Sequence, residues 1–89
     1  MRRDELRIIN RLGLHARAAA KLVAEAGHHA SSIRLRHQGD WIDGKSIMAV
    51  MMLAAGQGTV LEVEVDGPDE EAALQALQAL VADRFGEGE

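Results

Sequence analysis

Apolar residues recur at every second position in three stretches of the chain, residues 6–9, 32–37 and 59–65. This period of two is typical of a strand that has one face on a core and the other in water. A turn then precedes a short fourth strand at residues 41–42. The alternation predicts inward positions at Leu6, Ile8, Ile33, Leu35, His37, Leu61, Val63 and Val65, and outward positions at Val60, Glu62 and Glu64.

Two other stretches carry apolar residues at helical spacing. In residues 16–26 they lie at Ala19, Leu22, Val23 and Ala26, and Gly27 is expected to stop this helix. A second helix is predicted to begin near Asp69. Its apolar stripe comprises Ala73, Leu74, Leu77, Leu80, Val81 and Phe85. Gly86 is expected to end the helix and to leave residues 87–89 frayed.

A shorter helix is predicted at residues 47–53, with Ser46 as its N-cap. It is apolar nearly all round, and so small a protein cannot bury every face of a short helix. We expect Val50 and Leu53 to point inward, and Ile47, Met48 and Met51 to point outward. The methionines could simply pack in the core. Methionine is also adaptable at protein-binding surfaces, however, and a docking patch is the favoured interpretation.

The predicted order of elements is β-α-β-β-α-β-α. Four strands with one apolar face each imply an antiparallel sheet covered on one side by helices. The first and last helices have the well-formed apolar stripes that this role requires. We therefore expect an α+β two-layer sandwich over residues 1–89, as one domain with a small but sufficient core.

The composition argues against several classes of function. The chain has one Trp, one Phe and no Tyr, and its net charge is −4, so nucleic-acid binding is not expected. It has no Cys, which removes disulfides and thiolate metal sites. No apolar run follows the charged N-terminal residues, so we expect no signal peptide, no membrane insertion and a cytoplasmic protein. A monomer is the simplest expectation.

His15 lies between a Gly-Leu turn and the alanine-rich first helix. A helix start leaves backbone N–H groups unpaired and carries partial positive charge, so it favours an anion. The same positive end disfavours an imidazolium cation and so helps to keep the histidine a neutral nucleophile. Arg17, two residues further on, can hold phosphoryl oxygens. We hypothesise that His15 carries a phosphoryl group.

Each candidate also has a simpler interpretation. His15 could be an exposed loop histidine or a structural helix cap. Ser46 could be an N-cap only, although a phosphate there would also lie at a helix N-terminus. His28, His29 and His37 are scattered along the chain and no paired carboxylates accompany them, so no metal site is expected.

Two segments carry a family resemblance. Residues 10–17 read Asn-Arg-Leu-Gly-Leu-His-Ala-Arg, and residues 44–48 read Gly-Lys-Ser-Ile-Met. They resemble the active-site and regulatory-serine signatures of the HPr family, the small histidine phosphocarrier proteins of bacterial phosphotransferase systems. The resemblance covers nearly the whole chain and implies the family's open-faced β-sandwich.

The resemblance implies that His15 accepts a phosphoryl group from phospho-enzyme I, which phosphoenolpyruvate charges, and passes it to a IIA-type protein. Arg17 would assist both transfers, and no cofactor is expected. Ser46 matches the serine that a bifunctional HPr kinase/phosphorylase modifies in some bacteria. The positions where the family docks its partners correspond to Ala20, Ile47, Met48 and Met51. The protein would be a phosphoryl shuttle rather than a free-standing catalyst.

Ala18 departs from the sugar-transport pattern, in which proline usually follows the active-site arginine. The alanine run that begins there is more similar to the nitrogen-related branch, NPr, whose role is regulatory. Two rival functions stay open. A regulatory binding module would act through Ser46 phosphorylation or docking, without phosphoryl flux through His15. An unrelated ligand-binding domain would need a concave pocket, which the sequence gives no reason to expect.

Overall fold

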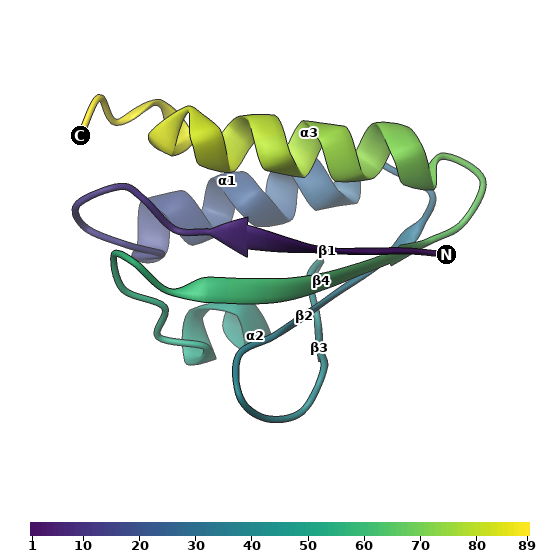
Figure 1. Ribbon diagram of the computed structural model, residues 1–89, viewed down its shortest axis with the longest axis horizontal. Coiled ribbons are helices and arrows are strands. Elements are labelled where there is room, and N and C mark those ends of the chain that lie inside the picture. The colour runs from purple at the N-terminus through teal and green to yellow at the C-terminus, as the bar shows by residue number, and fades with distance from the viewer.

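Four strands and three α-helices follow one another in the predicted order (Figure 1), in a computed structural model that describes residues 1–89. The elements are β1 (Arg2–Arg7), α1 (Ala16–Gly27), β2 (Ser32–Arg36), β3 (Ile42–Asp43), α2 (Ile47–Met52), β4 (Val60–Asp66), α3 (Glu70–Ala82) and a 3-10 turn, η1 (Arg84–Gly86). The α+β class is confirmed.

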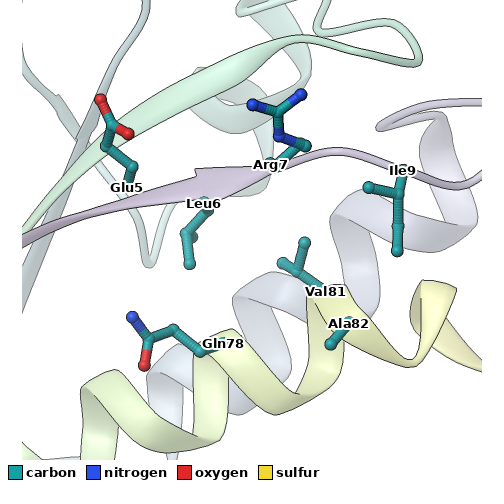
Figure 2. A pocket seen from close by; sticks show the side chains of 7 residues that line it. All are labelled: Glu5, Leu6, Arg7, Ile9, Gln78, Val81 and Ala82. Atoms are coloured by element: carbon teal, nitrogen blue, oxygen red, sulfur yellow. The ribbon is translucent and has the colours of Figure 1, made fainter.

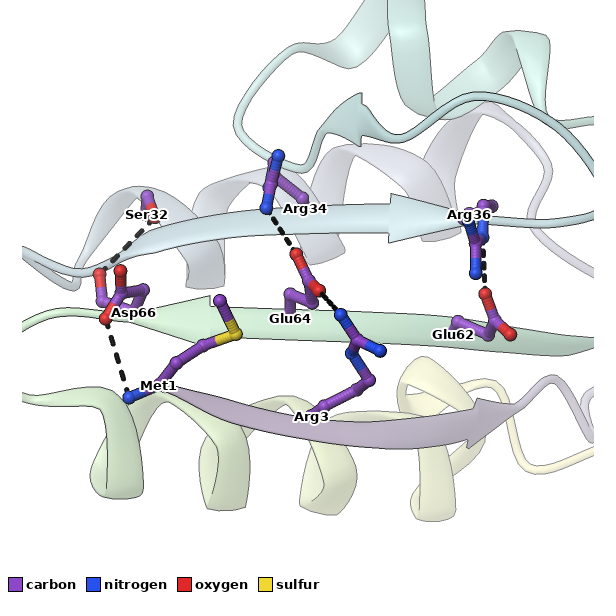
Figure 3. Close-up of polar contacts among 8 residues, drawn as sticks. All are labelled: Met1, Arg3, Ser32, Arg34, Arg36, Glu62, Glu64 and Asp66. Atoms are coloured by element: carbon purple, nitrogen blue, oxygen red, sulfur yellow. Dashed lines mark hydrogen bonds and ion pairs between the residues drawn. The ribbon is translucent and has the colours of Figure 1, made fainter.

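The strands form one antiparallel sheet in the order β1-β4-β2-β3. Helices α1 and α3 lie together over one face of this sheet (Figure 1), and charged side chains of β1, β2 and β4 project from the other face (Figure 3). The core between the layers comprises 19 buried residues, all aliphatic except Phe85. The predicted open-faced sandwich is therefore confirmed.

Alternation along the strands predicts the buried side chains well. Every predicted inward position except His37 is at most 2% exposed. His37 is exposed because β2 ends one residue earlier, at Arg36. Strand β1 begins at Arg2 rather than at residue 6, because its backbone pairs with β4 from Arg2↔Val65 to Arg7↔Val60. Backbone pairing, which apolar alternation does not report, decides where an edge strand begins.

The open face of the sheet carries a cluster of cations around Glu64. Its side chain points outward as predicted, yet the residue is only 3% exposed, because the guanidinium groups of Arg3 and Arg34 both pair with its carboxylate (Figure 3). The hydrogen bond from Arg3 is the main cause that lowers the pKa of Glu64. Trp41 precedes β3 instead of beginning it, and Arg36 lies 4.4 Å from its ring centroid. This face is held by ion pairs and cation–π contacts.

The helix ends differ from the predictions in informative ways. Gly27 does not stop α1 in a left-handed conformation: it is the last helical residue, and His28 caps the helix with φ −77°. Helix α3 ends at Ala82 rather than at Gly86. Asp69 is the N-cap of α3, but its carboxylate accepts no hydrogen bond from that helix and binds the Ser31 backbone N–H at 2.9 Å instead. A tertiary contact thus replaces the local cap.

Candidate functional site

The loop before α1 is seated against the residues that follow α2. The Leu14 N–H donates to the Ala55 carbonyl at 2.8 Å. Gly13 has φ +68°, and a Cβ at this position would lie 2.7 Å from the same carbonyl oxygen. Only glycine combines this backbone conformation with so close an approach. The loop therefore holds His15, the residue after Leu14, in a defined place at the start of α1.

His15 is the N-cap of α1, as predicted, but its imidazole makes no capping hydrogen bond. Its carbonyl accepts the Ala19 N–H at 2.8 Å, which leaves the N–H groups of Ala16, Arg17 and Ala18 without a backbone acceptor. The interpretation of His15 as a side-chain cap is therefore wrong. The imidazole lies at a helix end whose donors and dipole suit an anion.

A polar hollow of about 640 Å³ opens beside this helix end. His15 and Arg17 line it from the start of α1, Lys21 from the next turn, and Glu87 from the tail that follows α3. Arg17 is exposed and forms no ion pair within the chain. Its guanidinium is therefore available to an incoming anion, which makes the hollow suitable for a phosphoryl group.

The C-terminal tail lies against this site, and the prediction that residues 87–89 are frayed is wrong. Phe85 is 1% exposed, and its carbonyl accepts a hydrogen bond from Lys21 Nζ at 2.6 Å. The Arg11 N–H donates to the Glu89 carbonyl at 2.6 Å. The glycines and charges of this segment suggest disorder, and the stripe position of Phe85 is the only sequence signal for its packing.

Glu87 and Asn10 belong to the polar network beside His15, and the sequence did not predict this role for either residue. One Glu87 oxygen, Oε2, contacts His15 Nε2, and the other, Oε1, accepts a hydrogen bond from Asn10 Nδ2 at 2.8 Å. The hydrogen bonds from His15 and then Asn10 hold the pKa of the Glu87 carboxyl below its ordinary value. The Glu87 carboxylate thus stays charged beside the imidazole. Asn10 belongs to the signature segment, but nothing in the sequence connects it with Glu87.

Ser46 lies at the other end of the helix pair. It caps α2 as predicted, and its Oγ accepts the Ala49 N–H at 3.3 Å. Lys45 Nζ donates to the His29 carbonyl beyond the end of α1, whereas the residues after α2 contact the loop before α1. Helices α1 and α2 therefore run in opposite directions. Ser46 and His15 lie at opposite ends of the pair.

Helix α2 presents an exposed apolar surface. The predicted outward side chains Ile47, Met48 and Met51 are 37%, 71% and 44% exposed, and Met52 adds a fourth at 82%. Val50 is fully buried and Leu53 is half-buried, as expected. Ala20 is exposed on α1, which packs against α2. We call Ala20, Ile47, Met48, Met51 and Met52 the α2 patch.

The remaining candidates carry less chemistry. His29 does have carboxylate partners, contrary to prediction: Glu25 lies 2.9 Å from Nε2 and Asp69 3.4 Å from Nδ1. No group of three or more His, Cys, Asp or Glu side chains lies close enough together to hold a metal ion. A second hollow, of about 310 Å³, lies between β1 and α3 (Figure 2), where Leu6 and Val81 point toward each other. Glu5 and Arg7 are the charged residues that line it, and it contains no histidine, serine or lysine.

Fold and site together define a class of protein: a small α+β protein that presents one histidine, beside an arginine, at an open helix N-terminus. Comparison with known proteins narrows the class. The family described as "PTS HPr component phosphorylation site" matches residues 2–83. The chain belongs to the HPr family, the phosphocarrier proteins of the phosphotransferase system. In addition, none of its helices has the length and apolar character needed to cross a membrane.

Named relatives agree over nearly the full length. The chain is 58% identical to phosphocarrier protein HPr of Cupriavidus necator over 92% of both chains, and 56% identical to that of Pseudomonas aeruginosa over 96% of both. Among solved structures, it matches HPr-C-His from Thermoanaerobacter tengcongensis with a TM-score of 0.93 and 39% identity, covering 98% of each chain.

Proposed function

We propose that His15 is the residue through which this phosphocarrier accepts and donates its phosphoryl group. The observation that carries the proposal is the imidazole at the open N-terminus of α1, beside an unpaired Arg17. His15 Nε2 is engaged by Glu87, so Nδ1 is the ring nitrogen left to attack phosphorus. Its lone pair forms the new P–N bond while the bond from phosphorus to the phosphoryl donor breaks. Arg17 and the free N–H groups bind the phosphoryl oxygens.

The donor in this proposal is phospho-enzyme I and the acceptor is a IIA-type protein. Both would dock on the α2 patch, whose exposed apolar side chains lie on the helix next to α1. A shuttle needs fast docking of modest affinity, which a small apolar surface with an arginine at its edge provides. Cytoplasmic location, a monomeric state and assignment to the nitrogen-related branch stay predictions.

Phosphorylation of Ser46 by an HPr kinase/phosphorylase is the regulatory part of the proposal. Ser46 precedes Ile47 and Met48 directly, so a phosphate there adds charge at the edge of the α2 patch. Because Ser46 and His15 lie at opposite ends of the helix pair, the effect would act on docking rather than on the imidazole. A phosphate at an N-cap is compatible with the fold.

Labelling from phosphoenolpyruvate tests the proposal. Incubation with enzyme I and labelled phosphoenolpyruvate should give a label that is lost in acid, as expected for a phosphohistidine, and His15→Ala should carry none. His15→Ala also removes the contact with Glu87, so thermal unfolding of the variant must show that it is folded at the assay temperature. Label that persists in His15→Ala would refute the assignment. A parent protein without label would favour the rival, a regulatory binding module.

A further inference from the structure

Glu87 links the proposed nucleophile to a fully buried amide. Its two carboxylate oxygens have different partners: Oε2 contacts His15 Nε2 and Oε1 accepts from Asn10 Nδ2. Asn10 is 0% exposed, and the same Nδ2 also donates to the Gly13 carbonyl at 2.7 Å. The Glu87 side chain itself is only 12% exposed. The carboxylate is therefore held from both sides, and it holds the imidazole in turn.

The backbone that presents Glu87 is kept in an unfavourable conformation. Arg84 and Phe85 both have φ 54°, in the left-handed region that non-glycine residues rarely adopt. Burial of the Phe85 ring and the hydrogen bond from Lys21 Nζ to its carbonyl maintain this turn. Strained backbone of this kind persists where the surroundings over-determine it, commonly beside functional sites. The tail is thus anchored so that Glu87 reaches the imidazole.

We infer that Glu87 is a positioning residue for phosphoryl transfer, acting through His15. This inference rests on the proposed function of His15. The carboxylate can only accept a hydrogen bond, so the imidazole proton stays on Nε2 and the lone pair stays on Nδ1. A carboxylate that orients a nucleophilic or basic histidine in this way fixes both its tautomer and its ring plane.

The same contact stabilises the phosphorylated state. When the Nδ1 lone pair bonds to phosphorus, the donor keeps the electron pair of its own bond to phosphorus as that bond breaks, and the proton on His15 Nε2 does not move. The phosphorylated ring then carries positive charge, which the Glu87 carboxylate neutralises from the Nε2 side. Transfer to the acceptor reverses these changes without any further proton transfer.

Glu87→Gln tests the inference because it reverses the polarity of the contact. Asn10 Nδ2 is a donor, so it retains the amide oxygen of the new side chain and turns the amide N–H group toward His15. Nε2 then becomes an acceptor and the ring proton shifts to Nδ1. The rate of phosphoryl acceptance from phospho-enzyme I should fall about 10- to 100-fold, the usual loss when the partner of an oriented histidine is removed. The ¹⁵N shifts of the ring should report the proton on Nδ1 instead of Nε2.

Two further variants separate this role from a structural one. Glu87→Asp keeps a carboxylate, so it should keep the proton on Nε2 and recover part of the rate. Asp83→Asn removes an exposed carboxylate just before the same tail that forms no ion pair and does not line the His15 hollow, so rate and tautomer should both stay as in the parent. Thermal unfolding of all three checks that the tail still folds.

Several outcomes would overturn the inference. Glu87→Gln could accept phosphoryl groups at the parent rate and keep the ring proton of His15 on Nε2. That result would leave Glu87 without a positioning role. A faster Glu87→Gln protein would show that the carboxylate blocks the site. Both results leave the function of His15 intact, whereas absence of phosphoenolpyruvate-dependent label in the parent would refute that function itself.

Discussion

Met48→Glu is the sharpest test of the α2 patch, because Met48 lies on a helix whose two sides differ completely in burial. Met48 is 71% exposed, while Val50, two residues further on, is 0% exposed. A charge at residue 48 therefore meets water in the free protein. The substitution should change the free energy of unfolding by no more than about 0.5 kcal/mol.

The expected effect on docking follows from the surface that a partner would cover. Complete burial of a methionine side chain contributes about 1.5–3 kcal/mol. Since 71% of Met48 is available for burial, docking can gain roughly 1–2 kcal/mol from it, or about 5- to 30-fold in Kd. Placing a carboxylate against an apolar partner surface adds a desolvation cost, so this range is a lower bound.

Calorimetric titration of enzyme I with each variant measures the effect, together with the rate of phosphoryl transfer at sub-saturating protein. Ala79→Glu, on the exposed side of α3, adds the same charge away from the patch and should bind like the parent. Val50→Glu should instead greatly lower the free energy of unfolding, because it buries an unpaired charge. Parent affinity in Met48→Glu would refute the docking surface, and a large loss of stability would show that Met48 belongs to the core.

Two other predictions concern Ser46 and Asp69. Ser46→Asp should slow phosphoryl acceptance without loss of stability, because Asp is an equally good N-cap. Ser46→Ala should lose about 1 kcal/mol in urea unfolding yet transfer at the parent rate, and equal rates in all three proteins would leave Ser46 a cap only. Hydrogen bonds from the Ser31 side chain and the Ala30 N–H hold the pKa of the Asp69 carboxyl well below its ordinary value. The contribution of Asp69 to the free energy of unfolding is therefore complete above its unfolded-state pKa of about 4. This contribution is lost as pH falls through the lower folded-state pKa. Asp69→Asn should therefore be less stable than the parent, and the difference should be largest near neutral pH and shrink below about pH 4. Asp40→Asn, at an exposed position, is the control. A difference that does not change with pH, or an equal loss of stability in the control, would contradict the stabilising role of the Asp69 carboxylate.

Local chemistry in the sequence determined much of the fold and the main features of the site. Alternation placed the core side chains of the strands because neighbouring side chains on a strand point to opposite faces. His15 at the start of α1 was equally predictable, since a glycine turn followed by an alanine run specifies a helix start within a few residues. The outward side chains of α2 followed from the impossibility of burying every face of a short helix.

Contacts between distant parts of the chain were decided only by the tertiary structure. Glu87 reaches His15 across 72 residues, and Glu64 is covered by arginines from two other strands. The Asp69 carboxylate accepts a hydrogen bond from the backbone N–H of Ser31, just before β2, instead of from its own helix. Periodicity reports which face a residue occupies, but it contains no information about which distant side chain lies opposite. That depends on how sheet, helices and tail pack, and here the packing places a carboxylate from the C-terminal tail beside the imidazole.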